Sequence, residues 1–186
     1  MLNHSGTQTL QSKRLTLRQF TIDDTEAAFN NWCNDDAVTR FLTWPTHDST
    51  EVTKCVLNDW IVSYKNKDFY QWAIVLNEID EPIGSISIIA YDDTTDTVEV
   101  GYCIGRSWWH KGIMTEAFTC LIDYLFNEIK VNRIQAKHDM RNPHSGQVMM
   151  KCGLTYEGTL RQAALCNQGL SDVSVYSLLR SEWEKK

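Results

Sequence analysis

The feature that most constrains the fold is a change of periodicity in the middle of the chain. Three runs rich in β-branched and aromatic residues follow one another at 70–76, 83–91 and 98–104, and each is typical of a strand. Short polar segments join them, so they predict an antiparallel meander. From Gly112 the apolar residues recur at helical spacing instead. A chain with this switch is expected to fold as a mixture of sheet and helices.

The remaining elements fit around this block. A strand is expected near 15–18, followed by two helices that begin close to Thr21 and Asp48. After the Gly112 helix the pattern predicts a strand at 133–138, a helix opening at Asn142-Pro143, and strands at 155–161 and 173–179. The expected order is β-α-α-β-β-β-α-β-α-β-β. We therefore expect one α+β domain over residues 1–186, with a core spanning 12–181.

Composition excludes several classes of protein. The 186 residues carry 18 Lys and Arg against 24 Asp and Glu, a net charge of −6, whereas nucleic-acid binders carry a basic balance or stripe. No apolar run is long enough to span a membrane, and the polar first residues are not a secretory signal. The 6 Cys form no closely spaced pair of the kind that binds zinc. We expect a cytoplasmic protein without a nucleic-acid or membrane partner and without a metal.

A candidate anion site lies between 98 and 117, where a strand runs through a short loop into a helix. The first N–H groups of a helix have no partner within the helix, and its dipole favours negative charge. Gly112 lets the backbone approach a phosphate closely, and Lys111 and Arg106 add positive charge. From the residues alone, a single glycine at a helix start more commonly marks a plain turn.

At these residues the chain resembles the GNAT superfamily of acetyl-coenzyme A-dependent N-acetyltransferases. Residues 109–114 are similar to its motif A, Gln/Arg-x-x-Gly-x-Gly/Ala, although the first and last positions depart from it. Residues 9–18, 141–145 and 151–161 resemble the branch of ribosomal-protein N-terminal acetyltransferases, the RimJ/RimL-like branch. The resemblance covers nearly the whole chain. It implies a GNAT-type mixed, splayed central sheet, mostly antiparallel and flanked by helices.

The resemblance also implies where acetyl-coenzyme A would bind. Backbone amides of the loop would cradle the pyrophosphate, and the strand before it would pair with the pantetheine arm. Asn142 is both the expected cap of its helix and, by resemblance, a coenzyme A contact. The residues placed at coenzyme A are Tyr102, Cys103, Ile104, His110, Lys111, Gly112, Ile113, Met114, Thr115, Asn142 and Ser145.

The implied reaction is acetyl transfer to a primary amine, which must be neutral to attack the thioester. An α-amino group with a pKa of about 8 loses its proton near neutral pH more easily than a lysine. We therefore expect a protein or peptide N-terminal α-amine as acceptor, by direct transfer in a ternary complex. The alternatives are a small-molecule amine, such as a polyamine, amino acid or drug, and a coenzyme A-binding module without catalysis. A homodimer is implied by resemblance only.

Two residues are the catalytic candidates. Glu99, on the strand leading to the loop, is the candidate base; its alternative is a solvent-facing strand glutamate. Ser145 is the candidate acid for the leaving thiolate, or else a first-turn residue that stabilises the helix start. In much of the superfamily a helical tyrosine donates to that thiolate, but Met149 occupies the matching position. A covalent route through Cys103 is disfavoured, because nothing in the sequence activates it.

The acceptor side has fewer signals. Trp44, in an apolar loop, is a candidate for the substrate pocket, whereas Trp32 and Trp60 fit core packing better. RimL-like enzymes carry a glutamate where this chain has Ala164. Asp172 could supply that negative charge, although its alternative is a plain strand-start acid.

Overall fold

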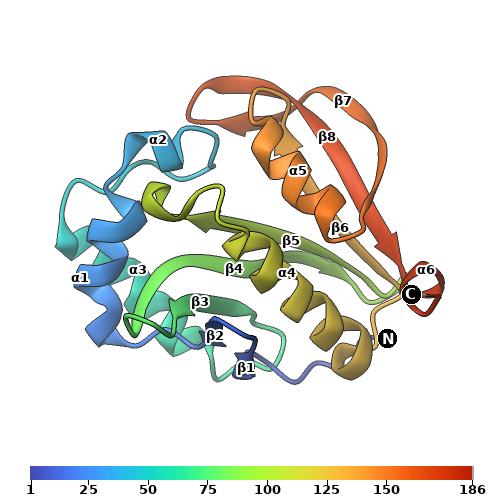
Figure 1. The fold of residues 1–186 in the computed structure, drawn as a ribbon, viewed down its shortest axis with the longest axis horizontal. Coiled ribbons are helices and arrows are strands. Elements are labelled where there is room, and N and C mark those ends of the chain that lie inside the picture. Colours follow the sequence, from blue (N-terminus) through green and yellow to red (C-terminus); the bar gives the residue numbers. More distant parts are fainter. Residues whose placement is uncertain (186) are drawn as a thin grey trace.

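The computed structural model describes residues 1–185; residue 186, the end of the expected domain, lies outside this range. It contains an eight-stranded sheet in the order β1-β2-β3-β4-β5-β6-β8-β7, with helices on both faces (Figure 1). Seven strand contacts join the eight strands, and β5–β6 is the parallel one among them. The expected mixed, mostly antiparallel α+β architecture is confirmed.

The strands and α-helices follow the expected order, with three short additions. The strands are β1 (Leu10–Gln11), β2 (Leu15–Arg18), β3 (Gln71–Leu76), β4 (Glu81–Asp92), β5 (Thr97–Ile104), β6 (Arg133–Asp139), β7 (Thr155–Cys166) and β8 (Gly169–Leu179). The helices are α1 (Thr25–Ala28), α2 (Asp36–Thr39), α3 (Thr50–Ser63), α4 (Ile113–Tyr124), α5 (Pro143–Lys151) and α6 (Arg180–Trp183). The additions are β1, α2 and α6, which are too short to show a periodicity in the sequence.

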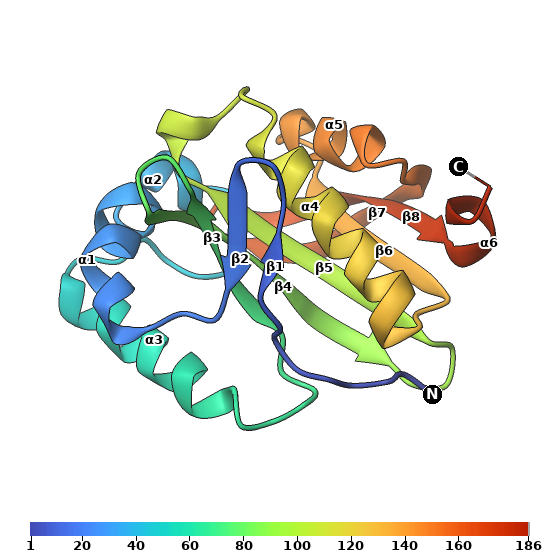
Figure 2. The same ribbon diagram turned by 60° about the horizontal axis from the view of Figure 1, so that its bottom comes forward.

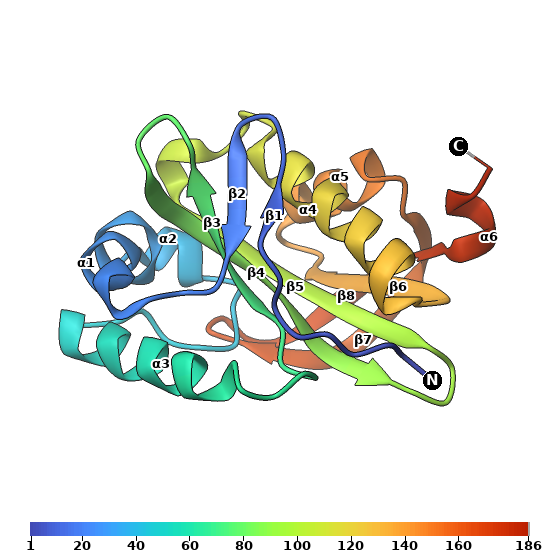
Figure 3. The same ribbon diagram turned by 90° about the horizontal axis from the view of Figure 1, so that it is seen from below.

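Strands β1 to β5 form what we call the N-terminal arm of the sheet. They pair antiparallel in chain order, which confirms the meander. Helices α1 to α3 cover one face and α4 covers the other (Figure 3). Because both faces are covered, β3 buries five of its six residues. A strand covered in this way reads as a continuous apolar run.

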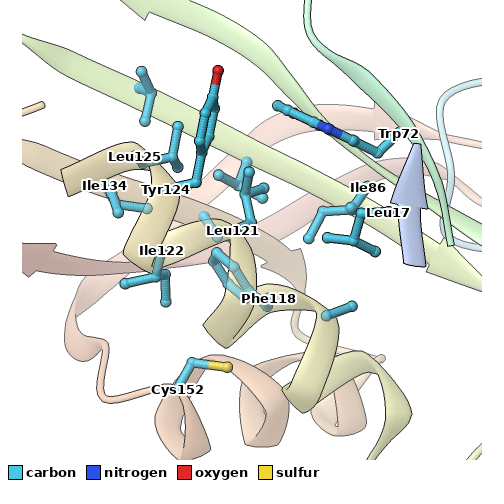
Figure 4. Packing of buried hydrophobic residues seen from close by; sticks show 14 of the residues in the cluster. Leu17, Trp72, Ile86, Phe118, Leu121, Ile122, Tyr124, Leu125, Ile134 and Cys152 are labelled. Carbon is cyan, nitrogen blue, oxygen red and sulfur yellow. The ribbon is translucent and has the colours of Figure 1, made fainter. Parts of the chain in front are cut away.

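Helix α4 carries the centre of the core. Its residues Phe118 and Leu121 are fully buried and pack in one cluster with Trp72 and Ile86 of the sheet (Figure 4). Gly112 caps the helix in the left-handed region, at φ 72°. A residue with a Cβ is strained there, which explains glycine at this position.

The sheet separates after a short parallel contact between β5 and β6. The contact consists of three residue pairs and ends at Glu99 and Gln135. Beyond that point the two strands diverge (Figure 1), and β6 continues beside β8 instead. We call this separation the gap. It confirms the expected splay of the central sheet and leaves one edge of β5 from 100 to 104 without a paired strand.

Strands β6, β8 and β7 form the C-terminal arm, with α5 on one face. The last two strands are longer than the expected 155–161 and 173–179, because their pairing resumes beyond an irregularity between Leu160 and Ala164. Polar residues such as Gln162 and Ser171 hide this extension from the sequence pattern. Unlike β3, strand β7 buries none of its residues.

The inner face of α3 departs from the expected one at its first residue. The apolar residues that recur at helical spacing in the sequence, and so predict this face, are Val52, Val56, Leu57, Trp60, Ile61 and Tyr64. Val52 is 40% exposed, whereas Thr53 and Leu57 are the buried residues. The Thr53 hydroxyl is hydrogen-bonded to Nδ1 of the buried His47 at 2.7 Å. A buried hydroxyl with a partner costs little, so a polar residue occupies the inner face.

Candidate active site

The loop before α4 presents backbone N–H groups at one place. His110 and Gly112 both have positive φ, 60° and 72°, on either side of Lys111. Such alternating conformations turn successive N–H groups into an anion-binding concavity. The side chains of Ile113 and Met114 are buried in the core, so these residues offer an anion only their backbone. The expected loop residues therefore lie together at the start of α4.

Arg14, in the β1–β2 turn, is hydrogen-bonded both to this loop and to the first turn of α4. Its Nε bonds Glu116 Oε2 at 2.7 Å, and another guanidinium nitrogen donates to the Lys111 carbonyl at 3.2 Å. Glu116 also accepts from the Arg14 backbone and from Ser12, and these bonds lower the pKa of Glu116 despite its partial burial. Figure 2 shows the β1–β2 hairpin beside the start of α4. Glu116, in the first turn of α4, thus links the helix start to the β1–β2 turn.

The end of β5 offers backbone groups to the gap. Gly105 N donates to Ile83 O of β4 at 2.8 Å, and Cys103 is paired with Ser85 of β4. Since neighbouring residues of a strand point their N–H and C=O groups to opposite sides, those of Tyr102 and Ile104 face the gap. The Ile104 carbonyl accepts from the Trp109 indole at 2.9 Å. An extended ligand arm could pair with this edge as an added strand.

Helix α5 lines the gap from the other side. Asn142 is its N-cap with Pro143 at the first position, but within residues 1–185 the Asn142 side chain makes no capping hydrogen bond. The Ser145 hydroxyl donates to the Tyr102 hydroxyl at 3.1 Å, and Tyr102 donates to the Ser145 carbonyl at 2.9 Å. Burial raises the pKa of Tyr102 well above its usual value. The structure thus brings the expected Ser145 to the expected strand segment.

Glu99 lies where the gap opens, on the opposite face of the sheet from Tyr102. Its side chain is 14% exposed and its Oε2 accepts from Lys137 Nζ at 2.7 Å and from Gln135 Nε2 at 2.8 Å. Tyr102 packs on Phe118 of α4 instead. Because residues of one strand alternate between faces, the candidate base and the candidate acid approach the gap from opposite sides.

The thiol of Cys103 lies on the α1–α3 face beside Ser85, with Sγ and Oγ 3.4 Å apart. Burial raises its pKa above the ordinary thiol value. A thiol that stays protonated is a poor nucleophile. This environment supports direct transfer over a covalent cysteine intermediate.

The two acceptor candidates have structural partners. The ring of Trp44 packs on His47 at 5.3 Å between centroids. Asp172 lies inside β8 rather than at the start of a strand, and its side chain accepts from the Gln162 backbone at 2.8 Å within the β7–β8 hairpin. Trp32 is 1% exposed in the second core cluster, and Trp60 packs against it, as expected of core packing.

Asn167, at the β7–β8 turn, ties that turn to the loop after α2. Its side-chain nitrogen donates to the carbonyls of Thr39 at 2.9 Å and Trp44 at 2.7 Å, and its backbone N–H donates to Leu42. An open hollow of about 680 Å³ lies beside this contact. It is lined by Asp36, Ala37, Thr39, Arg40, Pro45, Thr46, Asn167 and Gln168.

Two further searches cover the part of the chain that the structure describes. Residues 1–185 contain no group of three or more His, Cys, Asp or Glu side chains placed to hold a metal ion. None of the helices in that range combines the length and the apolar character that crossing a membrane would require.

Sequence reasoning missed three contacts at the site. Arg14 carries a signal only through the resemblance of its segment, whereas Lys137 beside Glu99 depends on the parallel β5–β6 register. That register cannot be read from one strand at a time. Asn167 looks like an ordinary turn residue, since its three acceptors lie more than 120 residues earlier in the chain.

Comparisons with known proteins agree with this geometry. The family model of the acetyltransferase (GNAT) domain matches residues 14–155. The uncharacterized N-acetyltransferase p20 of Bacillus licheniformis is 32% identical over 179 residues, covering 95% of this chain and 98% of that protein. The ribosomal-protein-serine acetyltransferase of Escherichia coli K12 is 29% identical over 137 residues, covering 73% of this chain and 75% of that protein.

A solved structure shares the fold. RimL, described as a ribosomal L7/L12 alpha-N-protein acetyltransferase in complex with coenzyme A, superposes with a TM-score of 0.82 at 22% identity. The match covers 94% of this chain and 99% of that one. Together with the family model, which spans most of the chain, these matches agree with the resemblance of the motifs. The chain belongs to the GNAT family and is an N-acetyltransferase.

Proposed function

We propose that this protein transfers the acetyl group of acetyl-coenzyme A to a primary amine, with a protein or peptide N-terminal α-amine as the acceptor. The observation that carries the proposal is the loop before α4, where His110 and Gly112 have positive φ on either side of Lys111, a conformation that gathers backbone N–H groups for an anion. Lys111 and Arg14 lie at the same loop. A pyrophosphate fits this donor set, since it needs several N–H donors and positive charge.

The proposal assigns the other residues at the gap to binding of the pantetheine arm, stabilisation of the oxyanion and proton transfer. The pantetheine arm pairs with the gap-facing backbone of Tyr102 and Ile104, whose N–H groups are also the candidates for stabilising the tetrahedral oxyanion. Asn142 and Ser145 contact coenzyme A from α5. Glu99 takes the proton of the amine, directly or through a water, from the opposite face of the sheet.

Two observations favour an N-terminal acceptor. The relatives include enzymes named for the acetylation of ribosomal-protein serine and alanine. An α-amine also needs less help from the base than a lysine does, which suits a glutamate whose Oε2 is already engaged by Lys137. Trp44 and the hollow at the β7–β8 turn are the surfaces that would meet the acceptor. A small-molecule amine is the second candidate.

The test is mass spectrometry of acceptors incubated with the protein and acetyl-coenzyme A. The panel contains peptides with free Ala, Ser and Met N-termini, an N-terminally blocked lysine peptide, polyamines, free amino acids and aminoglycosides. We expect a gain of one acetyl group at the α-amine of a peptide. Acetylation of a small amine alone would instead assign the protein to metabolite or drug modification.

A matched pair of glycine variants separates binding from catalysis. Gly112→Ala and Gly169→Ala place the same strain on left-handed residues, at φ 72° and 84°, but only Gly112 lies in the loop. We expect Gly112→Ala alone to weaken acetyl-coenzyme A binding by several-fold in calorimetry. Equal affinities in the two variants would contradict the role of the loop. Tight binding with no acceptor modified would favour a module without catalysis.

The proposal also covers the setting of the enzyme. We infer a cytoplasmic location, since none of the 6 Cys forms a disulfide within residues 1–185. A homodimer is the proposed assembly, and light scattering on the purified chain would test it. A monomer at micromolar concentration would remove that part of the proposal and leave the chemistry unchanged.

A further inference from the structure

A hydroxyl pair joins the two sides of the gap. Tyr102 extends from β5 and Ser145 lies in the first turn of α5, 43 positions later in the chain. The Ser145 Oγ and the Tyr102 hydroxyl are 3.1 Å apart, and the same phenol is 2.9 Å from the Ser145 carbonyl. One phenol therefore has two acceptors within hydrogen-bond distance, both on Ser145.

This arrangement lets the hydrogen bonds reverse without movement of heavy atoms. In the structure the phenol donates to the Ser145 carbonyl, and the serine hydroxyl donates to the phenol. If the phenol turns its proton to the serine Oγ, the serine proton is released toward the gap. A hydroxyl hydrogen rotates easily to suit its partners. The serine hydroxyl can thus donate to a ligand in the gap while its Oγ accepts a hydrogen bond from the phenol.

The Tyr102 phenol is suited to act as a hydrogen-bond donor and not as a general acid. Burial disfavours the phenolate and raises the pKa of Tyr102. A departing thiolate, with a conjugate acid pKa of about 8.5 for an ordinary thiol, is a much weaker base than this phenolate. Tyr102 therefore stays protonated throughout and acts through its hydrogen bond.

We propose that Tyr102 is a positioning residue, whose phenol holds the Ser145 hydroxyl as the hydrogen-bond donor to the departing coenzyme A thiolate. This inference rests on the proposed function. In the step, the amine nitrogen bonds to the acetyl carbon, the C–S bond breaks, and its electron pair goes to sulfur. The amine proton leaves through Glu99 or water, and both hydroxyl protons stay on their oxygens. Met149, at the position of the helical tyrosine that donates to the thiolate in much of the superfamily, is buried in the core and has no hydroxyl. In this chain a tyrosine on strand β5 supports the thiolate instead, through Ser145.

A second tyrosine–serine pair provides a matched control. Tyr124 of α4 is hydrogen-bonded to the Ser5 hydroxyl at 2.7 Å and donates to the Gly6 carbonyl at 2.9 Å. Burial raises the pKa of Tyr124 too. This pair has the same chemistry but ties the N-terminal segment to the far end of α4. Tyr124→Phe therefore removes an equivalent buried hydroxyl outside the gap.

The test compares the binding of coenzyme A with that of desulfo-coenzyme A, which lacks the sulfur, by calorimetry at pH 9. At this pH a thiol with a pKa of about 8.5 is largely ionised. We expect the wild type to prefer coenzyme A. Ser145→Ala should lower that preference about tenfold, as for the loss of a hydrogen bond to a charged group, and Tyr102→Phe about threefold. Tyr124→Phe should keep it, and all variants should bind desulfo-coenzyme A alike.

Kinetics provide the second readout. Tyr102→Phe should lower kcat several-fold and leave KM for acetyl-coenzyme A unchanged. The bound thioester has no thiolate, and negative charge develops on sulfur only in the transition state, as the C–S bond breaks. A preference for coenzyme A that survives Tyr102→Phe would overturn the inference. A parallel loss of desulfo-coenzyme A affinity would overturn it as well, since it would show that the pair only holds α5 in place. A wild type that binds neither ligand would refute the proposed function, and this inference with it.

Discussion

The two arms of the sheet are built differently. In the N-terminal arm, β3 lies under helices on both faces and buries five of six residues. In the C-terminal arm, β7 is an edge strand that buries none, and Leu160, Leu165 and Leu170 of its hairpin are more than half exposed. Three residue pairs between β5 and β6 join the two arms within the sheet.

The difference shows how a splayed sheet can hold a ligand. The well-packed arm fixes the loop before α4 and the gap-facing edge of β5. The C-terminal arm contributes Asn142, Ser145 and the β7–β8 turn, and its outer strand β7 buries none of its residues. Local openings start where few apolar contacts are buried. We therefore expect the C-terminal arm to open at lower free energy than the N-terminal arm.

The largest effect should come from the core of the N-terminal arm. Phe118 is fully buried, and Phe118→Ala should lower the free energy of unfolding by about 3–5 kcal/mol, through lost burial and a cavity. Leu165→Ala, at a residue 65% exposed in β7, should change it by less than about 0.5 kcal/mol. Urea unfolding measures both. Similar losses in the two variants would remove the contrast between the arms.

Each arm contains a buried carboxylate paired with an arginine, so removing the two charges in turn compares the stability of the arms. Asp24 bonds Arg18 through both oxygens at 2.7 and 2.8 Å beside β2, and Asp139 bonds Arg141 at 2.6 and 2.9 Å at the end of β6. Asp24→Asn should cost about 2 kcal/mol. Asp139→Asn should cost about 1 kcal/mol, because Arg141 is half exposed and screened by water.

Hydrogen exchange should locate the two effects. Asp139→Asn is expected to speed exchange in β6, β7 and β8 while β3 keeps its protection. Asp24→Asn should act on the N-terminal arm and on global unfolding. Uniform acceleration in the Asp139→Asn variant would mean that the arms unfold as one unit.

Acid should loosen the C-terminal arm by a smaller amount. Hydrogen bonds from Arg141 lower the pKa of Asp139 to about 2, and those from Arg133 and Ser177 lower the pKa of Glu157 to about 2. Each contribution is complete above the unfolded values of about 4 and is lost as pH falls through the folded ones. Between pH 4 and 2, brief pepsin digestion should cut β7 and β8 first. First cuts in β3 would contradict this order.

The smallest effect concerns the β7–β8 turn. Asn167→Ala removes two side-chain hydrogen bonds to the carbonyls of Thr39 and Trp44. At an exposed turn this should cost about 0.5 kcal/mol, yet exchange at the loop after α2 should rise clearly. Gln168→Ala, which removes a side-chain hydrogen bond to the neighbouring Asn167 carbonyl instead, is the matched control. If exchange is unchanged in Asn167→Ala, the turn is held by its backbone alone.

The sequence predicted the parts of this fold that depend on local periodicity. The meander at 70–104 and the helix after Gly112 have strong patterns, because each packs a continuous apolar face on the core. The extension of β7 and β8 was missed, since the added residues are mostly exposed or polar and show no apolar alternation. Val52 was placed inward on α3 because a buried threonine with a hydroxyl partner looks polar in the sequence.

The site divides in the same way. The loop at 109–115 lies within one short segment, so its residues could be named from the sequence together. The contacts of Glu99 with Lys137, and of Tyr102 with Ser145, join elements 38 and 43 positions apart. Such contacts depend on strand register and helix placement, and a single sequence specifies neither. Whether Glu99 and Ser145 act as base and donor stays a prediction.

The order β6-β8-β7 has a consequence for synthesis of the chain. The neighbour of β6 is β8, whose Leu179 pairs with Arg133. Strand β6 therefore cannot complete its pairing until the residues of β8, near the end of the described range, have been synthesised. The N-terminal arm, whose strands pair mostly in chain order, can begin to form while the ribosome is still translating, as N-terminal units generally do. The nascent chain would then expose the outer edge of β6, whose neighbour is β8, until β8 emerges. An unpaired strand edge is a template for pairing with other chains, so the late appearance of β8 leaves this edge open to aggregation during synthesis.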